Sequence, residues 1–398
     1  MNKKRVAIIG GGASGLICAI EAKTTNPELD IVIFEKLPKA CKKILVTGNG
    51  RCNFTNENLA PVHFFGDRCF LRNVLTSVHA DSENYFRSLG ILSYKEDGRI
   101  YPRSQQSSAI RDALLNKVNS LDINIKLETS VNEIKKDAKG FFIENEKFDA
   151  VVLCGGGKAA SVHGSDGSCY ALAEHFGHTK TTLYPALCGL LVNEKINLLK
   201  GVRAQCNVKL VSCNNVLGEE TGEVQFNENA ISGIPVMNLS HLCRDNKLLT
   251  VMLDLCHDIS STELFEHIKL QPKNDEIENI LGGIINSKLG FAVMDKASLK
   301  PHTTLKELSN KDINALCETL KNFTLKIKGT KGFDSAQVTC GGIKTDEIDA
   351  KTMMSHICNG LFLCGEILDI HGDCGGYNLH LAWTTGRIAG NSVAEYLK

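Results

Sequence analysis

The chain has 398 residues, of which 43% are hydrophobic and 23% charged, so it is long enough for two or three globular domains. Its 45 basic residues balance its 45 acidic ones, and this zero net charge argues against a protein that binds nucleic acid or anionic membranes through overall charge. The absence of an 18-residue apolar run and of a leader-like start, and the 16 scattered cysteines, predict a cytoplasmic protein with reduced thiols and no membrane span.

The first 35 residues predict a strand, a glycine turn, a helix and a second strand that ends in an acid. The turn places Gly10, Gly12 and Gly15 directly after the apolar run 6–9, and Glu35 follows 20 residues after Gly15. Such a turn lets a pyrophosphate approach the backbone at a helix N-terminus, and an acid at this distance accepts hydrogen bonds from an adenosine ribose. We therefore predict a dinucleotide site here; the alternative is a glycine-rich turn that binds nothing.

Residues 36–56 are too rich in glycine and polar residues for a regular helix or strand. We expect a loop that lies against the ligand, with Arg51 available for a phosphate. The alternative, which the loop alone does not exclude, is a surface turn whose lysines are solvated.

Residues 67–120 are expected to be mainly helical, with a hairpin at 95–99. Strands are predicted at 123–127, 141–143 and 148–153, and a helix at 166–177. The last of these strands leads into Gly155 and Gly156, which suggests a second place where a sheet edge meets the ligand.

The pattern of predicted strands and helices changes near residue 185. Short strand-like runs at 187–192, 204–212, 223–225, 248–254 and 324–328 surround a helical stretch at 258–322. We interpret 187–335 as an insertion, and because it lacks a second glycine fingerprint we expect no separate nicotinamide-binding domain.

The C-terminal stretch returns to the nucleotide domain. A buried strand is predicted at 361–369, followed by Gly375 and Gly376 before a helix at 379–396. Two glycine sites about 360 residues apart suit a ligand that spans the domain, with its diphosphate at the first and an isoalloxazine at the second. This favours FAD over NAD, although an ordinary loop-to-helix turn is the alternative. His371 and Cys374 have the spacing of metal ligands but no predicted partners, so no metal is expected.

Seven stretches together carry a family resemblance: GGGASG (10–15), KKILVTGNGRCNFTN (42–56), CGGG (154–157), YPALCGL (184–190), ISGIPVMNLS (231–240), AQVTCGGI (336–343) and the segment 365–390. They resemble the YhiN/BaiN-like family of FAD-dependent oxidoreductases across essentially the whole chain. The stretch GEVQFNENAISGIP departs from the family pattern, which leaves the substrate contacts of the insertion open.

The resemblance implies an α/β protein: a Rossmann-type FAD-binding domain (1–186 and 336–398) with an inserted β-barrel-like domain (187–257 and 323–335) and a helical subdomain (258–322). Together with the motifs above, it predicts cofactor contacts from Gly10, Gly12, Ala13, Ser14, Gly15, Glu35, Lys36, Lys43, Thr47, Gly48, Arg51, Cys52, Asn53, Val131, Gly155, Gly156, Gly365, Glu366, Asp369, Gly375, Gly376, Asn378 and Leu379. Tyr377 and Cys52 are the candidate proton donors, because both lie in predicted flavin-facing loops and carry transferable protons; each has the alternative of simply packing there.

The expected function is FAD-dependent reduction of an activated C=C or C=O bond in a small, apolar molecule such as a steroid or bile-acid enone. NAD(P)H or another reductant would be the transient electron donor. The alternatives are reduction of uridine in ribosomal RNA, oxidation of an amine such as aminoacetone, and a flavin redox regulator without turnover. A nucleic-acid partner is possible but not favoured, and the sequence gives no oligomeric state.

Overall fold

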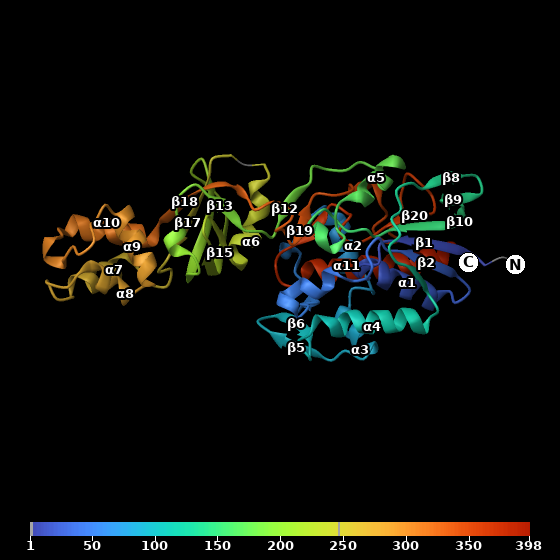
Figure 1. Ribbon diagram of the computed structural model, residues 1–398, viewed down its shortest axis with the longest axis horizontal. Helices are drawn as coiled ribbons and strands as arrows, with labels where there is room; N and C mark the ends of the chain where they lie inside the picture. Colours follow the sequence, from blue (N-terminus) through green and yellow to red (C-terminus); the bar gives the residue numbers. More distant parts are fainter. Residues whose placement is uncertain (1–2, 246) are drawn as a thin grey trace. The chain divides into compact units, whose positions relative to one another are not determined.

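The computed structural model describes residues 3–245 and 247–398, and the chain divides into two compact units (Figure 1). Unit 1 comprises Met1–Pro185 and Gln337–Lys398, and unit 2 is the continuous insertion Ala186–Ala336. Of the helices within the described ranges, none is long and apolar enough to span a bilayer.

A five-stranded parallel sheet forms the centre of unit 1, in the order β20-β11-β1-β2-β7. Its strands are β1 (Arg5–Ile9), β2 (Asp30–Phe34), β7 (Asn124–Lys126), β11 (Ala150–Leu153) and β20 (Leu361–Leu363). The central strands are almost fully buried, which explains their continuous apolar runs. The predicted strand at 361–369 is shorter than expected, because Gly365 turns the chain with a φ of 81°.

Two helices from opposite ends of the chain pack together beside this sheet: α1 (Ala13–Thr25) and α11 (Tyr377–Tyr396) (Figure 1). A Cβ on Gly386 would lie 2.6 Å from the Ser14 carbonyl oxygen, and one on Gly390 would lie 2.4 Å from that of Cys18. Glycines four residues apart therefore form the contact face of α11. On the same helix, the buried Trp383 donates a hydrogen bond from Nε1 to the Phe54 carbonyl at 2.8 Å, which ties α11 to the loop before β3.

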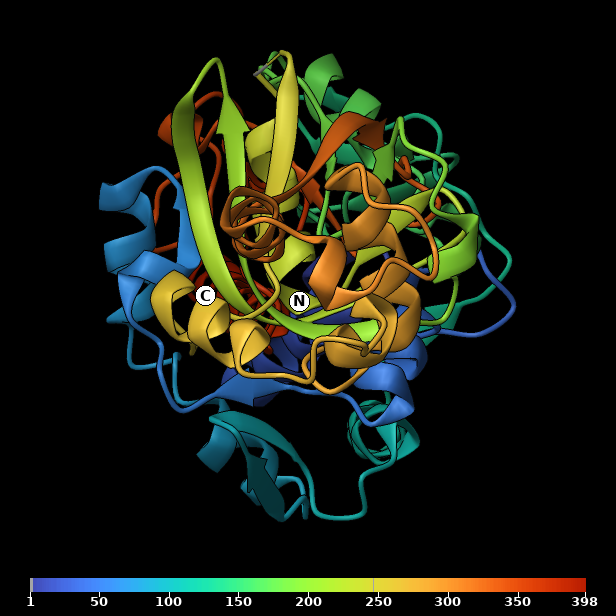
Figure 2. The ribbon, with the colours of Figure 1, turned by 90° about the vertical axis from the view of Figure 1, so that its left-hand side faces the viewer.

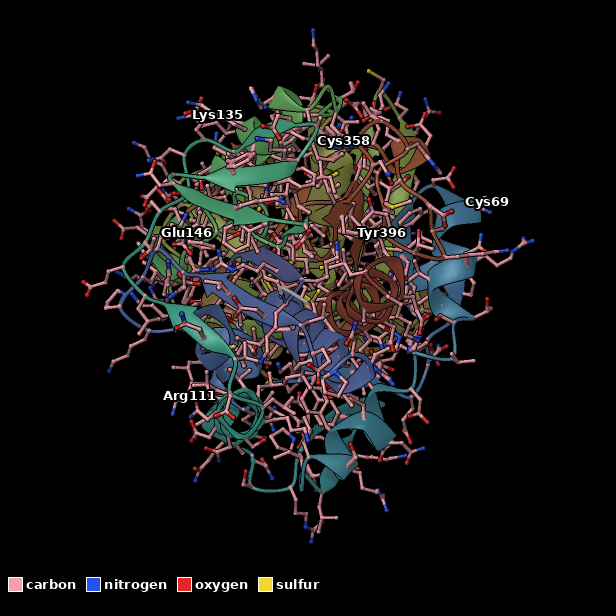
Figure 3. The ribbon with its side chains drawn as sticks, turned by 90° about the vertical axis from the view of Figure 1, so that its right-hand side faces the viewer. Cys69, Arg111, Lys135, Glu146, Cys358 and Tyr396 are labelled. Carbon is pink, nitrogen blue, oxygen red and sulfur yellow. The ribbon has the colours of Figure 1, made fainter. Side chains whose placement is uncertain are left out.

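The other regular elements of unit 1 surround this core. The helices are α2 (Arg68–Leu75), α3 (Ser82–Ser88), α4 (Ser107–Ser120) and α5 (Ser168–His175). The strands are β3 (Thr55–Asn56), β4 (Phe64–Gly66), β5 (Ser93–Glu96), β6 (Arg99–Pro102), β8 (Lys135–Asp137), β9 (Gly140–Ile143), β10 (Glu146–Phe148), β12 (Tyr184–Ala186), β19 (Val338–Cys340) and β21 (Ile370–Gly372). Short 3-10 turns lie at Pro61–His63 (η2), Ser161–His163 (η3) and Thr345–Glu347 (η7). The helices and hairpin expected within 67–120 are confirmed, and Figure 3 shows the three-stranded sheet β8–β10 between Lys135 and Glu146.

Unit 2 contains a closed antiparallel barrel in the order β13-β16-β15-β14-β17-β18. Its strands are β13 (Leu190–Val192), β14 (Arg203–Ser212), β15 (Asn215–Phe226), β16 (Ala230–Ser232), β17 (Leu249–Asp254) and β18 (Phe323–Thr330). Buried and partly exposed residues alternate along β17, as expected for a strand with one face inward. The prediction of an inserted barrel is confirmed, but β15 is much longer than the expected 223–225.

Two helices of unit 2 begin at capping boxes. Ser260 and Glu263 form a capping box at α7 (Ser261–Lys269), and Ser309 with Asp312 does so at α10 (Asn310–Lys321). The others are α6 (Ile234–Leu239), α8 (Ile277–Gly282) and α9 (Ser287–Lys296), with 3-10 turns at Asn197–Leu199 (η4), Ser240–Cys243 (η5) and Leu305–Glu307 (η6). Figure 2 views unit 2 with its helical segment 258–322, in yellow to orange, toward the viewer. The helical prediction for this segment is confirmed; its separation as a subdomain remains a prediction.

Candidate functional site

The candidate site lies in unit 1, where loops leave the carboxyl ends of the parallel strands. A sequence-predicted residue follows each of β1, β2, β7, β11 and β20 within five positions: Gly10, Glu35, Val131, Gly155 and Gly365. Because parallel strands end at the same edge of a sheet, the topology brings these five loops to one edge. These five loops therefore lie at one edge although they span residues 10 to 369.

The glycine turn after β1 leaves room for a ligand. A Cβ on Gly12 would meet no protein atom within 4 Å, whereas one on Gly15 would lie 2.0 Å from the Gly10 carbonyl oxygen. Gly15 thus lets α1 pack against the turn, and Gly12 keeps space open in front of it. Ala13 and Ser14 form the first turn of α1, where, in this fully described segment, no side chain caps the backbone N–H groups. Such a helix start suits an anion.

Glu35 is buried beside the glycine turn. Its Oε2 accepts a hydrogen bond from the Gly11 N–H at 2.9 Å, and its Oε1 accepts one from the Leu37 N–H at 2.8 Å. These bonds fix the carboxylate and leave it further acceptor capacity for ribose hydroxyls. The Thr129 N–H bonds to the Glu35 carbonyl at 2.9 Å, which brings the loop carrying the half-buried Val131 alongside.

The segment after β2 differs from the expected irregular loop. Lys43–Gly50 forms 3-10 turns (η1) that are interrupted where Gly48 and Asn49 adopt left-handed φ values of 55° and 56°. The Thr47 hydroxyl donates to the Ile44 carbonyl at 2.7 Å, and the Cys52 N–H bonds to the Thr47 carbonyl at 3.0 Å. These local bonds hold a compact turn.

Arg51, predicted to contact a phosphate, is paired with an acid and an aromatic ring. Its guanidinium pairs with Glu96 at 2.8 Å and lies 4.3 Å from the centre of the Tyr101 ring. Its charge is thus compensated by a part-exposed acid, and its contact with a phosphate stays a prediction. Glu96 is 45 residues away in the hairpin, which explains why the sequence did not reveal the pair.

The two predicted lysine contacts are also paired with acids. Lys36 Nζ lies 2.5 Å from Asp166, and Lys43 Nζ donates to Glu366 Oε2 at 2.8 Å. Glu366 Oε1 also accepts from the Thr339 N–H at 3.0 Å, so this carboxylate joins the loop after β20 to η1 and β19. Asp369, in the same loop, accepts from the Thr181 hydroxyl at 2.9 Å.

The glycines after β11 and β20 permit close packing of these loops. A Cβ on Gly155 would lie 2.6 Å from the Cys169 sulfur, and one on Gly156 would lie 2.9 Å from the Ser165 hydroxyl. A Cβ on Gly365 would lie 2.4 Å from the Ser14 hydroxyl at the start of α1. The last contact places the loop after β20 directly beside the glycine turn.

The second predicted glycine site lies at the start of α11, which begins at Tyr377, two residues earlier than expected. Gly376 has a φ of 94°, and a Cβ there would lie 2.8 Å from Asn53 Oδ1. That oxygen is buried and has no hydrogen-bond partner among the described residues. Asn56 Nδ2 bonds to the Gly375 carbonyl at 2.9 Å. The loop 53–56 and the glycine pair therefore form one surface, with a polar atom left for a ligand.

Asn378 and Leu379 have structural contacts of their own. The Asn378 amide spans the turn by accepting from the Gly372 N–H at 2.8 Å and donating to the Gly372 carbonyl at 2.7 Å. Leu379 is half-buried against the hydrophobic core. Any contact of these residues with a cofactor would therefore come from the backbone at the helix start.

The two candidate proton donors differ in their surroundings. Cys52 is fully buried, and burial raises the pKa of its thiol to about 12. Tyr377 stacks on His63 at 4.8 Å, and burial followed by the nearby Asp373 charge raises the pKa of its phenol to about 12. The phenol is thus protonated at neutral pH. Both candidates have polar neighbours: Thr47 hydrogen-bonds to Cys52, and His63 and Asp373 adjoin Tyr377.

Sequence reasoning missed His63 and Asp373. His63 Nδ1 lies 3.1 Å from Asp373 Oδ2, and Nε2 lies 3.1 Å from Asn58 Nδ2. Since the amide nitrogen can only donate, we assign the tautomer with hydrogen on Nδ1. The pair joins η2 to the glycine-rich turn before α11 across 310 residues, a separation at which no local pattern gives a signal.

These features fit FAD. The open space at Gly12 and the uncapped start of α1 suit the diphosphate, and Glu35 suits the ribose. The unpartnered Asn53 oxygen and the glycine pair before α11 suit a polar ring system at the other end. Gly12, Ala13, Ser14, Glu35, Asn53 and Gly376 are the residues that would hold it.

Comparisons with known proteins identify the family of the chain. The chain matches the family described as HI0933-like protein Rossmann domain over residues 4–392. It is 37% identical over 406 aligned residues to the 3-dehydro-bile acid delta(4,6)-reductase of Clostridium scindens, and the alignment covers 98% of this chain and 99% of the relative. It is 26% identical to the ribosomal RNA dihydrouridine synthase of Escherichia coli, and the alignment covers 97% of this chain and 96% of that relative. One solved structure it resembles is 3-ketosteroid delta1-dehydrogenase from Sterolibacterium denitrificans, with a TM-score of 0.46, 12% identity, and coverage of 98% of this chain and 99% of that one.

Proposed function

Because this chain belongs to the family of HI0933-like proteins with a Rossmann domain and is an FAD-dependent oxidoreductase, we propose that it reduces a conjugated carbon–carbon double bond in a steroid-like ketone. The observation that carries this proposal is the full-length similarity to a reductase that is named for a 3-dehydro bile acid. The substrate would be a small apolar molecule.

The proposed role of Tyr377 is to supply a proton. Reduction of a conjugated ketone adds a hydride to one alkene carbon and a proton to the other, and reduced FAD supplies the hydride when bound. Tyr377 keeps its proton at neutral pH, because burial raises the pKa of its phenol. His63, stacked on the Tyr377 ring and bonded to Asp373, would hold that ring in position.

The proposed electron donor is NAD(P)H or another small reductant that arrives transiently. The insertion carries no second glycine fingerprint in its sequence, so a pyridine nucleotide would share the open edge of the FAD site. We therefore expect weak and poorly selective saturation by NADH and NADPH.

The test follows the flavin absorbance. The enzyme is reduced under anaerobic conditions, and a 3-oxo steroid with conjugated 4,6-double bonds is added beside its saturated 3-oxo analogue. We expect only the conjugated ketone to reoxidise the flavin and to be recovered with two added hydrogens. Equal inactivity of both compounds, with flavin that other oxidants reoxidise normally, would contradict the proposal.

A second function is favoured by the similarity to ribosomal RNA dihydrouridine synthase. In the same anaerobic experiment, an unmodified ribosomal RNA fragment replaces the ketone, and dihydrouridine is measured by mass spectrometry. Dihydrouridine without any ketone reduction would favour this second function. We expect no such product, because an enzyme that follows an RNA backbone usually needs the positive charge that this chain lacks.

A further inference from the structure

Two buried cysteines adjoin each other where the central strands of unit 1 end. Cys154 follows β11 and Cys364 follows β20, and their sulfur atoms are 3.3 Å apart. Both side chains are buried, as is Cys18 on α1. All three are free thiols in this structure. The proposed reaction uses none of them.

The backbone at this position suits a disulfide. Leu153 and Leu363 are register partners in the parallel pair β11–β20, so Cys154 and Cys364 are the next partners along the two strands. Neighbouring strands lie about 4.8 Å apart, which is within the Cα separations of about 4.4–6.8 Å that a disulfide spans. Register partners also point to the same face of a sheet. The sulfur atoms need to approach from 3.3 Å to about 2.05 Å.

The two thiols are chemically unequal. Hydrogen bonds from Cys154 and then Cys18 lower the pKa of Cys364, burial acts in the opposite direction, and a hydrogen bond from Ser14 lowers it further. Burial raises the pKa of Cys154, which favours its thiol form. Cys364 is therefore the better nucleophile, and Cys154 is placed to react with its oxidised form.

The pair lies directly behind the predicted FAD loops. The next residues along the chain are Gly155 and Gly365. A Cβ on Gly10 would lie 2.6 Å from the Cys154 carbonyl oxygen, and one on Gly15 would lie 3.3 Å from the Cys154 Cβ. Because no side chain fits between Gly10 and Cys154, a shift of Cys154 reaches the glycine turn.

We propose that Cys154 and Cys364 form a reversible disulfide on exposure to hydrogen peroxide, and that this bond weakens FAD binding. The Cys364 thiolate attacks peroxide, which gives a sulfenic acid and releases hydroxide. The Cys154 sulfur then attacks the sulfenic sulfur, so the S–S bond forms and water leaves. A thiol reductant reverses the bond by exchange. By linkage, bound FAD protects the two thiols from oxidation. The inference concerns the FAD site and is independent of which substrate is reduced.

The test uses protein in which the two exposed cysteines are replaced, Cys69→Ser and Cys213→Ser, so that they do not form intermolecular bonds. Cys69 is labelled on α2 in Figure 3. Protein with and without FAD is treated with hydrogen peroxide, digested without reductant and analysed by mass spectrometry. We expect a peptide pair linked through Cys154 and Cys364, formed faster without FAD and removed by dithiothreitol.

Two further variants distinguish the Cys154–Cys364 pair from the neighbouring Cys18. Cys18→Ala should still form the linked peptide, whereas Cys364→Ala should not. Fluorescence titration with FAD should then give a dissociation constant raised about tenfold by oxidation in the Cys18→Ala protein and unchanged by oxidation in the Cys364→Ala protein. Absence of the linked peptide from FAD-free protein would overturn the proposed bond. A linked protein that binds FAD with unchanged affinity would overturn its proposed effect.

Discussion

Substitutions at two glycines in the turn after β1 should affect different properties, FAD binding at Gly12 and the stability of the fold at Gly15. Gly12→Val should weaken FAD binding strongly and leave the protein without FAD as stable as before. The reason is that a Cβ at Gly12 would meet no protein atom within 4 Å, while the side chain would enter the space assigned to the diphosphate. The measurements are FAD titration by flavin fluorescence and urea unfolding of the FAD-free protein.

Gly15→Ala is the matched comparison in the same turn. Its Cβ would lie 2.0 Å from the Gly10 carbonyl oxygen, so the backbone must move. We expect a loss of about 1–3 kcal/mol in the free energy of unfolding even without FAD. Normal FAD affinity in Gly12→Val would show that the diphosphate lies elsewhere.

Tyr377→Phe tests the proposed proton donor. The substitution keeps the ring that stacks on His63 and removes the phenolic hydrogen. We expect reduction of the conjugated ketone to slow by about 100-fold or more, because general acids typically contribute that much. FAD affinity and the rate at which NAD(P)H reduces the flavin should stay the same.

Tyr396→Phe is the control for that variant. Tyr396 lies at the other end of α11, where 42% of the residue is exposed (Figure 3). Removal of the Tyr396 hydroxyl should change neither the rate of ketone reduction nor the rate at which NAD(P)H reduces the flavin. If Tyr377→Phe also reduces the ketone at the normal rate, the proton comes from another group.

At the scale of elements, the sequence predicted those helices and strands whose signals come from adjoining residues. The unit β1, α1 and β2 is continuous in the chain, so its glycine spacing and apolar periodicity were readable. The helical stretch 258–322 was predicted from apolar spacing, which is equally local. β15 was underestimated, because its polar, glycine-containing sequence is held as a strand by pairing along β14.

The parts of the site that were missed depend on partners far along the chain. Glu96 occupies Arg51, and Asp373 bonds to His63 across 310 residues. Neither pair has a periodic pattern. The glycine turn needed no such partner for its prediction. The diphosphate end of the proposed site could therefore be predicted from adjoining residues, whereas the surroundings of Tyr377 could not.

Helix α11 carries a buried histidine that should make stability depend on pH. His380 is fully enclosed, with Nδ1 3.0 Å from the Thr55 hydroxyl and 3.1 Å from that of Ser82. Burial lowers the pKa of His380 to about 4, below its value of about 6.5 in an unfolded chain. The unfolded state therefore binds more protons between these pH values, and stability is lost as the pH falls from 6.5 toward 4.

We expect the free energy of unfolding of the FAD-free protein to fall by about 2 kcal/mol from pH 7 to pH 4.5 through this group. His380→Gln should reduce that difference, while His175→Gln on the exposed side of α5 should retain it. The measurement is urea unfolding at the two pH values. An undiminished difference in His380→Gln would assign the effect to other groups.

At the scale of the whole molecule, the division into two units predicts two unfolding steps. All the residues that fit FAD belong to unit 1, and the closed barrel gives unit 2 a core of its own. In calorimetry, FAD at 100 times its dissociation constant should add about 2.7 kcal/mol to unit 1 alone. The transition of unit 2 should stay at the same temperature, and an equal shift of both would mean that they unfold together.

The chain's single tryptophan has an optical consequence. Trp383 bonds to the Phe54 carbonyl, and Phe54 follows Asn53 in the surface that suits the ring system of the cofactor. Its emission therefore originates within unit 1 and overlaps the absorption of an oxidised flavin. Bound FAD should quench this emission by energy transfer, and release of FAD should restore it. The protein thus contains a built-in reporter of its own cofactor content, readable without any substrate.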